Sequence, residues 1–321
     1  MKTLQLSLVA AAGALICATA SAQTIVRASH PTPATSHYGV GTQAFCADLE
    51  KRTSNRYKCQ IQAGSNDERA SIEAVQLGTL DITNTSTGPV SNFVPEVGIV
   101  DIPFLFRDYD HARRVLDGPI GQDILAKFPS KGIIALAWTE NGFRHLTNSK
   151  RAVVKPEDVK GLKVRTMQNP VHIQAFQSIG VQPTPMAFSE LFTALQQGVV
   201  DGQENPIPVI LSSKFSQVQK HLSLTGHVYS PSLLLMSPKL YNSLSEADKT
   251  AFREAAKVGA AAQRKKVNDD ENAGIAQLRS DGMSVVTNVD GNAFRTAMTP
   301  VWADFATKYG ADNIRRIQEF K

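Results

Sequence analysis

The chain of 321 residues lacks the sequence patterns that mark a metal centre or a catalytic constellation. Its 7 histidines form no H-E-x-x-H motif and no pair four residues apart, and no cysteine pair accompanies them, so the sequence predicts no bound metal. A Gly-x-Ser-x-Gly elbow is also missing. Because no pattern brings together a nucleophile, a base and an orienting group, we expect a protein that is not an enzyme and that uses no cofactor.

Two further classes of function are disfavoured in the same way. Residues 39–44 (GVGTQA) fit the G-x-G-x-x-A dinucleotide pattern, but a proline-containing loop separates them from the strand expected before them. We therefore interpret them as the start of a helix. The formal net charge of +5 is spread along the chain, without a block of lysine and arginine or an interleaved aromatic stripe. This distribution favours small anions as partners and predicts no binding to nucleic acid.

Long hydrophobic runs are rare, and the one at the N-terminus predicts export. Residues 4–20 are almost wholly apolar, Lys2 precedes them, and residues 20–22 (ASA) form a small-x-small cleavage site. The run is too short for a transmembrane anchor, so we interpret residues 1–22 as a cleaved secretory signal peptide and expect the mature chain to begin at Gln23.

Cysteine is scarce as well. Cys17 lies in the predicted signal peptide, which leaves Cys46 and Cys59. An even count in an oxidising compartment favours a disulfide, here from a predicted helix to a predicted strand. It would close a loop of about 14 residues and contribute roughly 3 kcal/mol. The alternative is two buried free thiols.

The pattern that is present is that of an α/β protein. Expected strands alternate with expected helices, which predicts parallel sheets with helices on both faces. The run of residues 133–137 (IIALA) is typical of a parallel strand covered on both sides. The expected strands are residues 25–29, 57–63, 80–83, 131–138 and 162–165, and the expected helices include 38–53, 68–77, 108–116, a helix ending at Gly180, and 189–197.

One proline-free stretch, residues 245–281, departs from this alternation. It begins with Ser245 and carries Asp248 three positions later, a variant capping box. The stretch is either one long helix that braces two domains or two ordinary helices interrupted at Gly259 and Gly274.

Arginine supplies the remaining chemistry. Arg165 lies at the carboxyl end of the strand 162–165, where open α/β sheets bind ligands, and its planar guanidinium matches a carboxylate. Arg144 lies just past the strand 131–138. The alternative for either arginine is a surface ion pair. By default Asn205 would form only a turn, and Phe188 would belong to the core.

At these residues the chain resembles the solute-binding proteins of TRAP transporters, the DctP family. The resemblance covers essentially the whole mature chain, and its most specific part lies between Gly161 and Pro206. The matching segments are residues 66–69 (NDER), 77–81 (LGTLD), 102–106 (IPFLF), 161–165 (GLKVR), 183–190 (PTPMAFSE) and 201–206 (DGQENP).

The resemblance implies a role for particular side chains. Arg165 matches the arginine that pairs with the ligand carboxylate, and Asn205 matches the asparagine that orients that carboxylate. Arg144 matches a second arginine that contacts the ligand in sialic-acid binders. Phe188 matches an aromatic residue of the cleft, and Glu68 matches an acidic residue near the variable end of the ligand.

The same resemblance limits the ligand. Ser86 stands where sialic-acid binders place a glutamate, and Pro89 replaces a nearby arginine, so a sialic acid is not expected. His30, Asn84, Ser86 and Trp138 are the candidates for reading the distinguishing part of the ligand.

The family fold implies two α/β domains of the periplasmic-binding-protein type with a long helix that spans both. By this resemblance the first domain holds residues 23–141 plus 231–270, and the second holds 142–230 plus 271–321. The ligand lies between the domains, which close on it by hinge motion.

The implied function is capture of a small carboxylate in the periplasm and delivery to the membrane subunits of a TRAP permease, by a protein that we expect to be monomeric. A dicarboxylate or another short organic acid is the first choice of ligand, and a uronate-type sugar acid is the second. Two rival functions are a binding protein that serves a signalling receptor and a periplasmic enzyme acting on the same anion.

Overall fold

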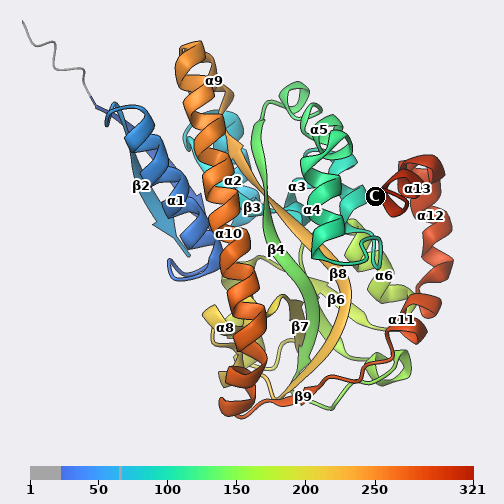
Figure 1. The fold of residues 1–321 in the computed structure, drawn as a ribbon. Coiled ribbons are helices and arrows are strands. Elements are labelled where there is room, and N and C mark those ends of the chain that lie inside the picture. The colour runs from blue at the N-terminus through green and yellow to red at the C-terminus, as the bar shows by residue number, and fades with distance from the viewer. Residues whose placement is uncertain (1–22, 65–66) are drawn as a thin grey trace, which may run out of the picture.

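The computed structural model describes residues 23–64 and 67–321, so the predicted signal peptide of residues 1–22 lies outside the described residues. The strands of the described chain form one sheet in the order β2-β1-β3-β8-β4-β7-β5-β6, with β9 paired to β8 (Figure 1). Their bounds are β1 Thr24–His30, β2 Tyr57–Ala63, β3 Ile82–Ser86, β4 Ile134–Asn148, β5 Lys163–Thr166, β6 Gln182–Pro185, β7 Gly202–Asn205, β8 His221–Met236 and β9 Ser284–Val286.

Helices cover this sheet and confirm the α/β class. Two elements, β2 and α2, have the bounds predicted from the sequence. The helices are α1 His37–Arg52, α2 Glu68–Leu77, α3 Thr87–Val90, α4 Tyr109–Asp117, α5 Pro119–Leu125, α6 Pro170–Ser178, α7 Phe188–Gln196, α8 Ile207–Ser212, α9 Pro238–Ser243, α10 Glu246–Ser280, α11 Gly291–Ala297, α12 Thr299–Tyr309 and α13 Ala311–Gln318, with 3-10 turns η1 Pro95–Asp101, η2 Pro129–Lys131, η3 Pro156–Val159 and η4 Phe215–Gln217. None of the helices in the described ranges is long and apolar enough to cross a membrane.

The prediction of parallel sheets is correct for the pairs of β1 with β2 and β3 and of β5 with β6 and β7, but it is wrong for the middle of the sheet. The sheet is mixed, because β4 runs antiparallel to both of its neighbours, β8 and β7. The predicted strand 131–138 overlaps the first part of β4, which begins at Ile134 and continues to Asn148, and residues 134–137 are only half-buried. An apolar run carries no information on strand direction, and here it did not predict full burial either. Register shifts on either side of Gly142 let the strand continue beyond the apolar run.

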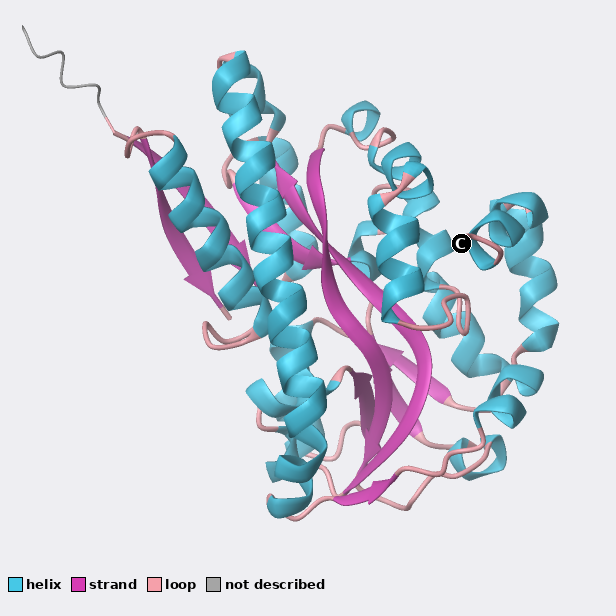
Figure 2. Ribbon diagram, in the orientation of Figure 1, coloured by secondary structure: helices cyan, strands magenta, loops and turns pink. Residues whose placement is uncertain are grey.

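The two longest strands hold the sheet together. Figure 2 shows β4 and β8 running side by side through the middle of the molecule. On one side of this pair, β8 is hydrogen-bonded to β3, and on the other side β4 is hydrogen-bonded to β7. The β4–β8 pair therefore joins the two outer parts of the sheet. The division into two domains stays a prediction.

The stretch 245–281 forms one helix, α10, which spans 35 residues. The Ser245 side chain accepts a hydrogen bond from the Asp248 backbone N–H, as the capping motif predicts, while the Asp248 carboxylate accepts from Arg56 and Tyr57. The glycines suspected of interrupting the helix serve packing instead. A Cβ on Gly259 would lie 2.8 Å from the Gly41 carbonyl oxygen in α1, and one on Gly274 would lie 2.4 Å from the Ile207 side chain in α8. Close packing of α10 against α1 and α8 therefore requires glycine at both positions.

The Cys46–Cys59 pair is a disulfide that joins α1 to β2, with the two Cα atoms 5.7 Å apart. Replacing both cysteines with serine is expected to lower the free energy of unfolding by about 3 kcal/mol, because the unfolded chain loses a cross-link. Urea denaturation of the mature protein measures this change. Reduced wild-type protein is the matched control and should unfold at nearly the same urea concentration as the double variant; an unchanged midpoint in both would contradict the prediction.

Candidate ligand-binding site

Strand ends that are far apart in the sequence meet around one small cavity. Ser86 ends β3, Arg165 is the second-last residue of β5, and Asn205 ends β7. The cavity has an empty volume of about 260 Å³, including the space open to solvent, and is lined by Pro31, Thr32, Tyr38, Glu68, Ser86, Asn141, Arg165, Met167, Phe188, Asn205 and Val209. Parallel strands such as β5 and β7 present their carboxyl ends at the same edge, which explains why Arg165 and Asn205 come together.

Arg165 is a buried cation with no carboxylate partner among the described residues. Its Nε and Nη2 donate to the Met186 carbonyl oxygen at 3.1 and 2.9 Å, and its Nη1 has no hydrogen-bond partner there. The guanidinium carbon lies 5.8 Å from the centre of the Phe188 ring. Burial and the nearby Arg144 lower the pKa of Arg165 to about 10, so it stays charged at neutral pH. A buried, partly unpaired charge of this kind favours binding of an anion.

Glu68 brings a carboxylate to the same cavity. Its Oε1 accepts hydrogen bonds from the Ser86 backbone N–H at 2.8 Å, from the Thr85 hydroxyl at 3.0 Å and from the Ser86 hydroxyl. These donors come from the end of β3 and fix the carboxylate at the N-terminus of α2. The cavity therefore combines a cation from one part of the chain with a hydrogen-bond acceptor from another.

Tyr38 is a cavity residue that the sequence did not indicate. It lies in the first turn of α1 and is buried. Burial raises the pKa of its phenol, and the Ser86 and Ser232 side chains offset only part of this rise. The Tyr38 hydroxyl has no hydrogen-bond partner among the described residues. An unsatisfied buried hydroxyl in a cavity is suited to a polar group of a ligand.

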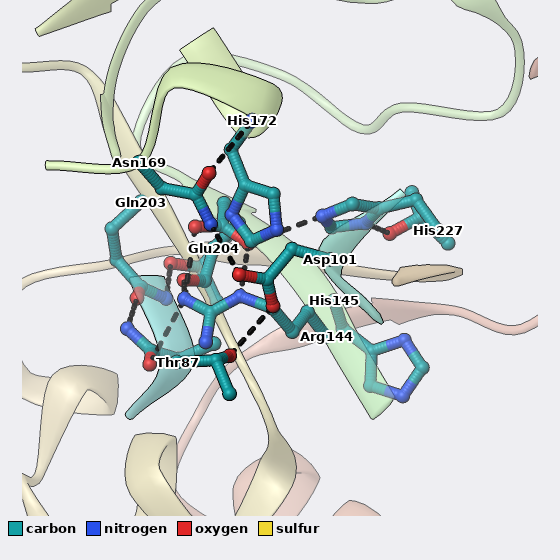
Figure 3. A network of polar contacts seen from close by, with 12 residues as sticks. Thr87, Asp101, Arg144, His145, Asn169, His172, Gln203, Glu204 and His227 are labelled. Carbon is teal, nitrogen blue, oxygen red and sulfur yellow. Dashed lines mark hydrogen bonds and ion pairs between the residues drawn. The ribbon is translucent and has the colours of Figure 1, made fainter. Parts of the chain in front are cut away.

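Arg144 differs from its prediction in two respects. It lies inside β4, not past the end of a strand, and it is not among the residues that line the cavity. Its Nη2 donates to the Glu204 carboxylate at 2.8 Å and to the Glu204 carbonyl oxygen at 2.5 Å (Figure 3). It also donates to Asn205 Oδ1 at 3.3 Å. Because Asn205 Nδ2 donates to Gln203 Oε1 at 2.5 Å, the Asn205 amide has a defined orientation. Asn205 was expected in a turn, but it is paired with His145 in the sheet.

The Arg144–Glu204 pair belongs to a buried polar network that sequence reasoning missed (Figure 3). Burial alone would raise the pKa of Glu204, but Arg144 and a hydrogen bond from His227 at 3.1 Å hold it below its ordinary value. Asp101, in η1, has its pKa raised to about 7 by burial, although Thr87 and Asn169 donate to it at 2.6 and 2.9 Å. For Glu204, its position directly before the candidate Asn205 was the sequence signal that could have drawn attention to it.

Comparison with known proteins identifies the family of this chain. The family of bacterial extracellular solute-binding proteins, family 7 (DctP), matches residues 28–308. The chain belongs to the DctP family. It is therefore a periplasmic solute-binding protein and not an enzyme.

Solved structures of DctP-family relatives are similar throughout. A TRAP periplasmic solute-binding protein from Polaromonas sp. JS666, bound to D-erythronate, is 62% identical with a TM-score of 0.92, over 93% of this chain and 99% of that one. One from Bordetella bronchiseptica, whose density is described as pantoate, is 52% identical with a TM-score of 0.92, over 93% and 100%. A sugar-acid-binding protein from Advenella mimigardefordensis, in complex with galactonate, is 34% identical with a TM-score of 0.89, over 92% and 97%.

Three of the specificity candidates do not reach the cavity of this DctP-family chain. Trp138 packs in the apolar core and donates from Nε1 to the Gly121 carbonyl oxygen at 3.1 Å. Asn84 is engaged with Gln263 at 2.7 Å and with Thr139 at 3.0 Å. His30 is buried at the end of β1, where burial lowers its pKa to about 4, and its neighbours Pro31 and Thr32 line the cavity in its place.

Larger hollows lie elsewhere on the DctP-family chain. One, with an empty volume of about 1300 Å³, lies between η1, α5, α12 and α13, and another, of about 1210 Å³, borders α10 and Trp138. Neither is lined by a fully buried charged side chain. Within residues 23–64 and 67–321 no group of three His, Cys, Asp or Glu side chains could hold a metal ion.

Proposed function

We propose that the protein binds a short, hydroxylated monocarboxylate, such as a four-carbon aldonate, in the cavity at Arg165 and delivers it to a TRAP permease. The observation that carries this proposal is the buried guanidinium of Arg165, which lines the cavity and keeps Nη1 without a partner among the described residues. The carboxylate of a ligand supplies the missing acceptor.

The carboxylate binds through several contacts at once. Arg165 supplies the charge, and Asn205, oriented by Arg144 and Gln203, supplies an amide N–H. A charge-assisted hydrogen bond contributes about 1.5–3 kcal/mol, whereas micromolar affinity needs about 8 kcal/mol. Excluding water around Arg165 strengthens each electrostatic contact, because the local dielectric constant falls.

Glu68 favours hydroxyl groups over a second carboxylate. Its carboxylate lines the cavity, is an acceptor when ionised, and would repel another negative charge. A ligand hydroxyl can donate to it, and Tyr38 offers a further polar contact. The erythronate and pantoate bound to the relatives with 62% and 52% identity are hydroxylated acids, which supports this choice within the small carboxylates.

The proposed transport cycle uses the predicted domains. Tyr38, Glu68 and Ser86 belong to the domain of residues 23–141 plus 231–270, and Arg165 and Asn205 belong to that of residues 142–230 plus 271–321. A ligand that contacts both sets favours the closed arrangement by its differential affinity for it. The membrane subunits of the permease then receive the ligand from the mature protein, which starts at Gln23 after removal of the signal peptide.

A thermal-shift screen with erythronate, pantoate, succinate and glucuronate tests the ligand class. Erythronate or pantoate is expected to stabilise the protein most, by about 2.7 kcal/mol when the ligand concentration is 100 times Kd.

Glu68→Gln should weaken erythronate binding and improve succinate binding, because it removes the negative charge but keeps an acceptor. Glu73→Gln, on the same helix but in an exposed ion pair with Arg69, is the control and should change neither. Succinate that binds the wild type as tightly as erythronate would contradict the role of Glu68.

A further inference from the structure

We propose that Met167, held against Gly88, sets the length of the acid that the cavity accepts. This inference rests on the proposed function, since it concerns the same cavity. Met167 follows β5, two residues after Arg165, and its side chain is buried while lining the cavity. It reaches from the strand that carries the arginine to the short helix α3, which follows Ser86.

The contact between Met167 and Gly88 leaves no free space behind the side chain. A Cβ built on Gly88 would lie 2.8 Å from Met167 Cε, 3.0 Å from Sδ and 3.1 Å from Cβ, closer than side chains pack. The methionine therefore lies directly on the backbone of α3. A longer ligand cannot push it further in that direction.

The chain around Met167 is also fastened to the segment that it contacts. Asn92 Nδ2 donates to the Gln168 carbonyl oxygen at 2.7 Å, and Asn169 Nδ2 donates to Asp101 Oδ2 at 2.9 Å. These two bonds join the residues after Met167 to the α3–η1 region, so the backbone that carries the side chain cannot retreat easily either. Although methionine is a flexible side chain, here its contact with Gly88 places it as one wall of the cavity.

The wall selects by exclusion. On this proposal, an acid with a four-carbon main chain, such as erythronate or pantoate, fits between Arg165 and this wall, whereas a six-carbon main chain extends into the volume that the Met167 thioether occupies. One methylene group of misfit in a pocket changes binding by roughly 10- to 200-fold. Length selection at Met167 is therefore strong enough to separate erythronate from galactonate.

Calorimetry with D-erythronate and galactonate tests the proposal. In Met167→Ala the ratio of the galactonate Kd to the erythronate Kd is expected to fall at least about tenfold, through tighter galactonate binding. Met167→Leu conserves volume and is the matched control, which should keep the wild-type ratio. A wild-type ratio in a folded Met167→Ala variant would overturn the proposal.

Gly88→Ala tests the same wall from the other side. Gly88 does not have a positive φ, so alanine fits its backbone, but the added Cβ must push Met167 into the cavity. Erythronate binding should weaken at least about tenfold, and the double variant Gly88→Ala/Met167→Ala should recover it. Wild-type affinity for erythronate in the Gly88→Ala variant would also overturn the proposal. Failure of the proposed function itself looks different, because the wild type would then bind neither acid.

Discussion

Arg165→Ala is expected to remove most of the affinity for the ligand carboxylate, at a cost of about 2–5 kcal/mol in binding free energy, or roughly 30-fold to several-thousand-fold in Kd. The physical reason is that Arg165 is the one cationic side chain among the described residues that line the cavity, so a carboxylate enclosed there would lose its partner. Isothermal titration with erythronate measures the change. Unchanged affinity would contradict the role of Arg165 as the anchor.

Two comparisons separate this loss from general damage to the fold. Arg165→Lys keeps the positive charge but loses the planar fork, so it should bind more weakly than the wild type and more tightly than the alanine variant. Unfolding of the unliganded alanine variant is the second comparison. Within the described part of the chain, Arg165 is a buried charge that donates its hydrogen bonds to the Met186 carbonyl oxygen. Its removal therefore relieves a desolvation cost, and the unliganded protein should remain folded.

Glu204→Ala is expected to have the largest effect on stability, a loss of about 3–5 kcal/mol in the free energy of unfolding. The variant leaves the guanidinium of Arg144 buried without its carboxylate partner. Denaturant unfolding without ligand measures the loss. The double variant Glu204→Ala/Arg144→Met removes the unpaired charge and should recover part of the stability, which a double-mutant cycle resolves.

The pH dependence of the same pair has a defined sign. The net effect of Arg144 and His227 is to lower the pKa of Glu204 from its ordinary value of 4.5. The contribution of the pair is therefore fully present above pH 4.5 and is lost as the pH falls below it.

Glu254→Ala, which breaks an exposed ion pair with Lys257, is the control for Glu204→Ala, and its free energy of unfolding should change little. A Glu204→Ala variant as stable as this control would contradict the expected cost.

Local sequence signals predicted the elements that local physics controls. Alternating apolar residues marked β2, and an acidic N-terminus with Gly78 after the last turn marked α2. The absence of proline between Ser245 and Asp281 allowed a single helix, yet the sequence left open an interruption at Gly259 and Gly274. Only the positions of α1 and α8 resolved it, because both glycines face those helices.

Side-chain partners across the sheet were beyond local reasoning. The second half of β4 and all of β8 were not predicted, and those strands bring Arg144 and His227 to Glu204. The resemblance assigned Arg144 to the ligand, and its pairing with Glu204 was not foreseen. Trp138 and His30 were candidates by resemblance, but both side chains are buried and neither lines the cavity.

The sequence by itself determined the α/β class, the disulfide as a possibility, and Arg165 as a strand-end cation suited to a carboxylate, and it predicted an export signal. These depend on composition, on spacing along the chain and on the direction of a single strand. The tertiary structure decided which groups share the cavity with Arg165, namely the Glu68 carboxylate, the Tyr38 hydroxyl and the Met167 wall. The physical reason is that a ligand is selected by groups from strands and helices that are neighbours only after folding, and their distances are set by packing.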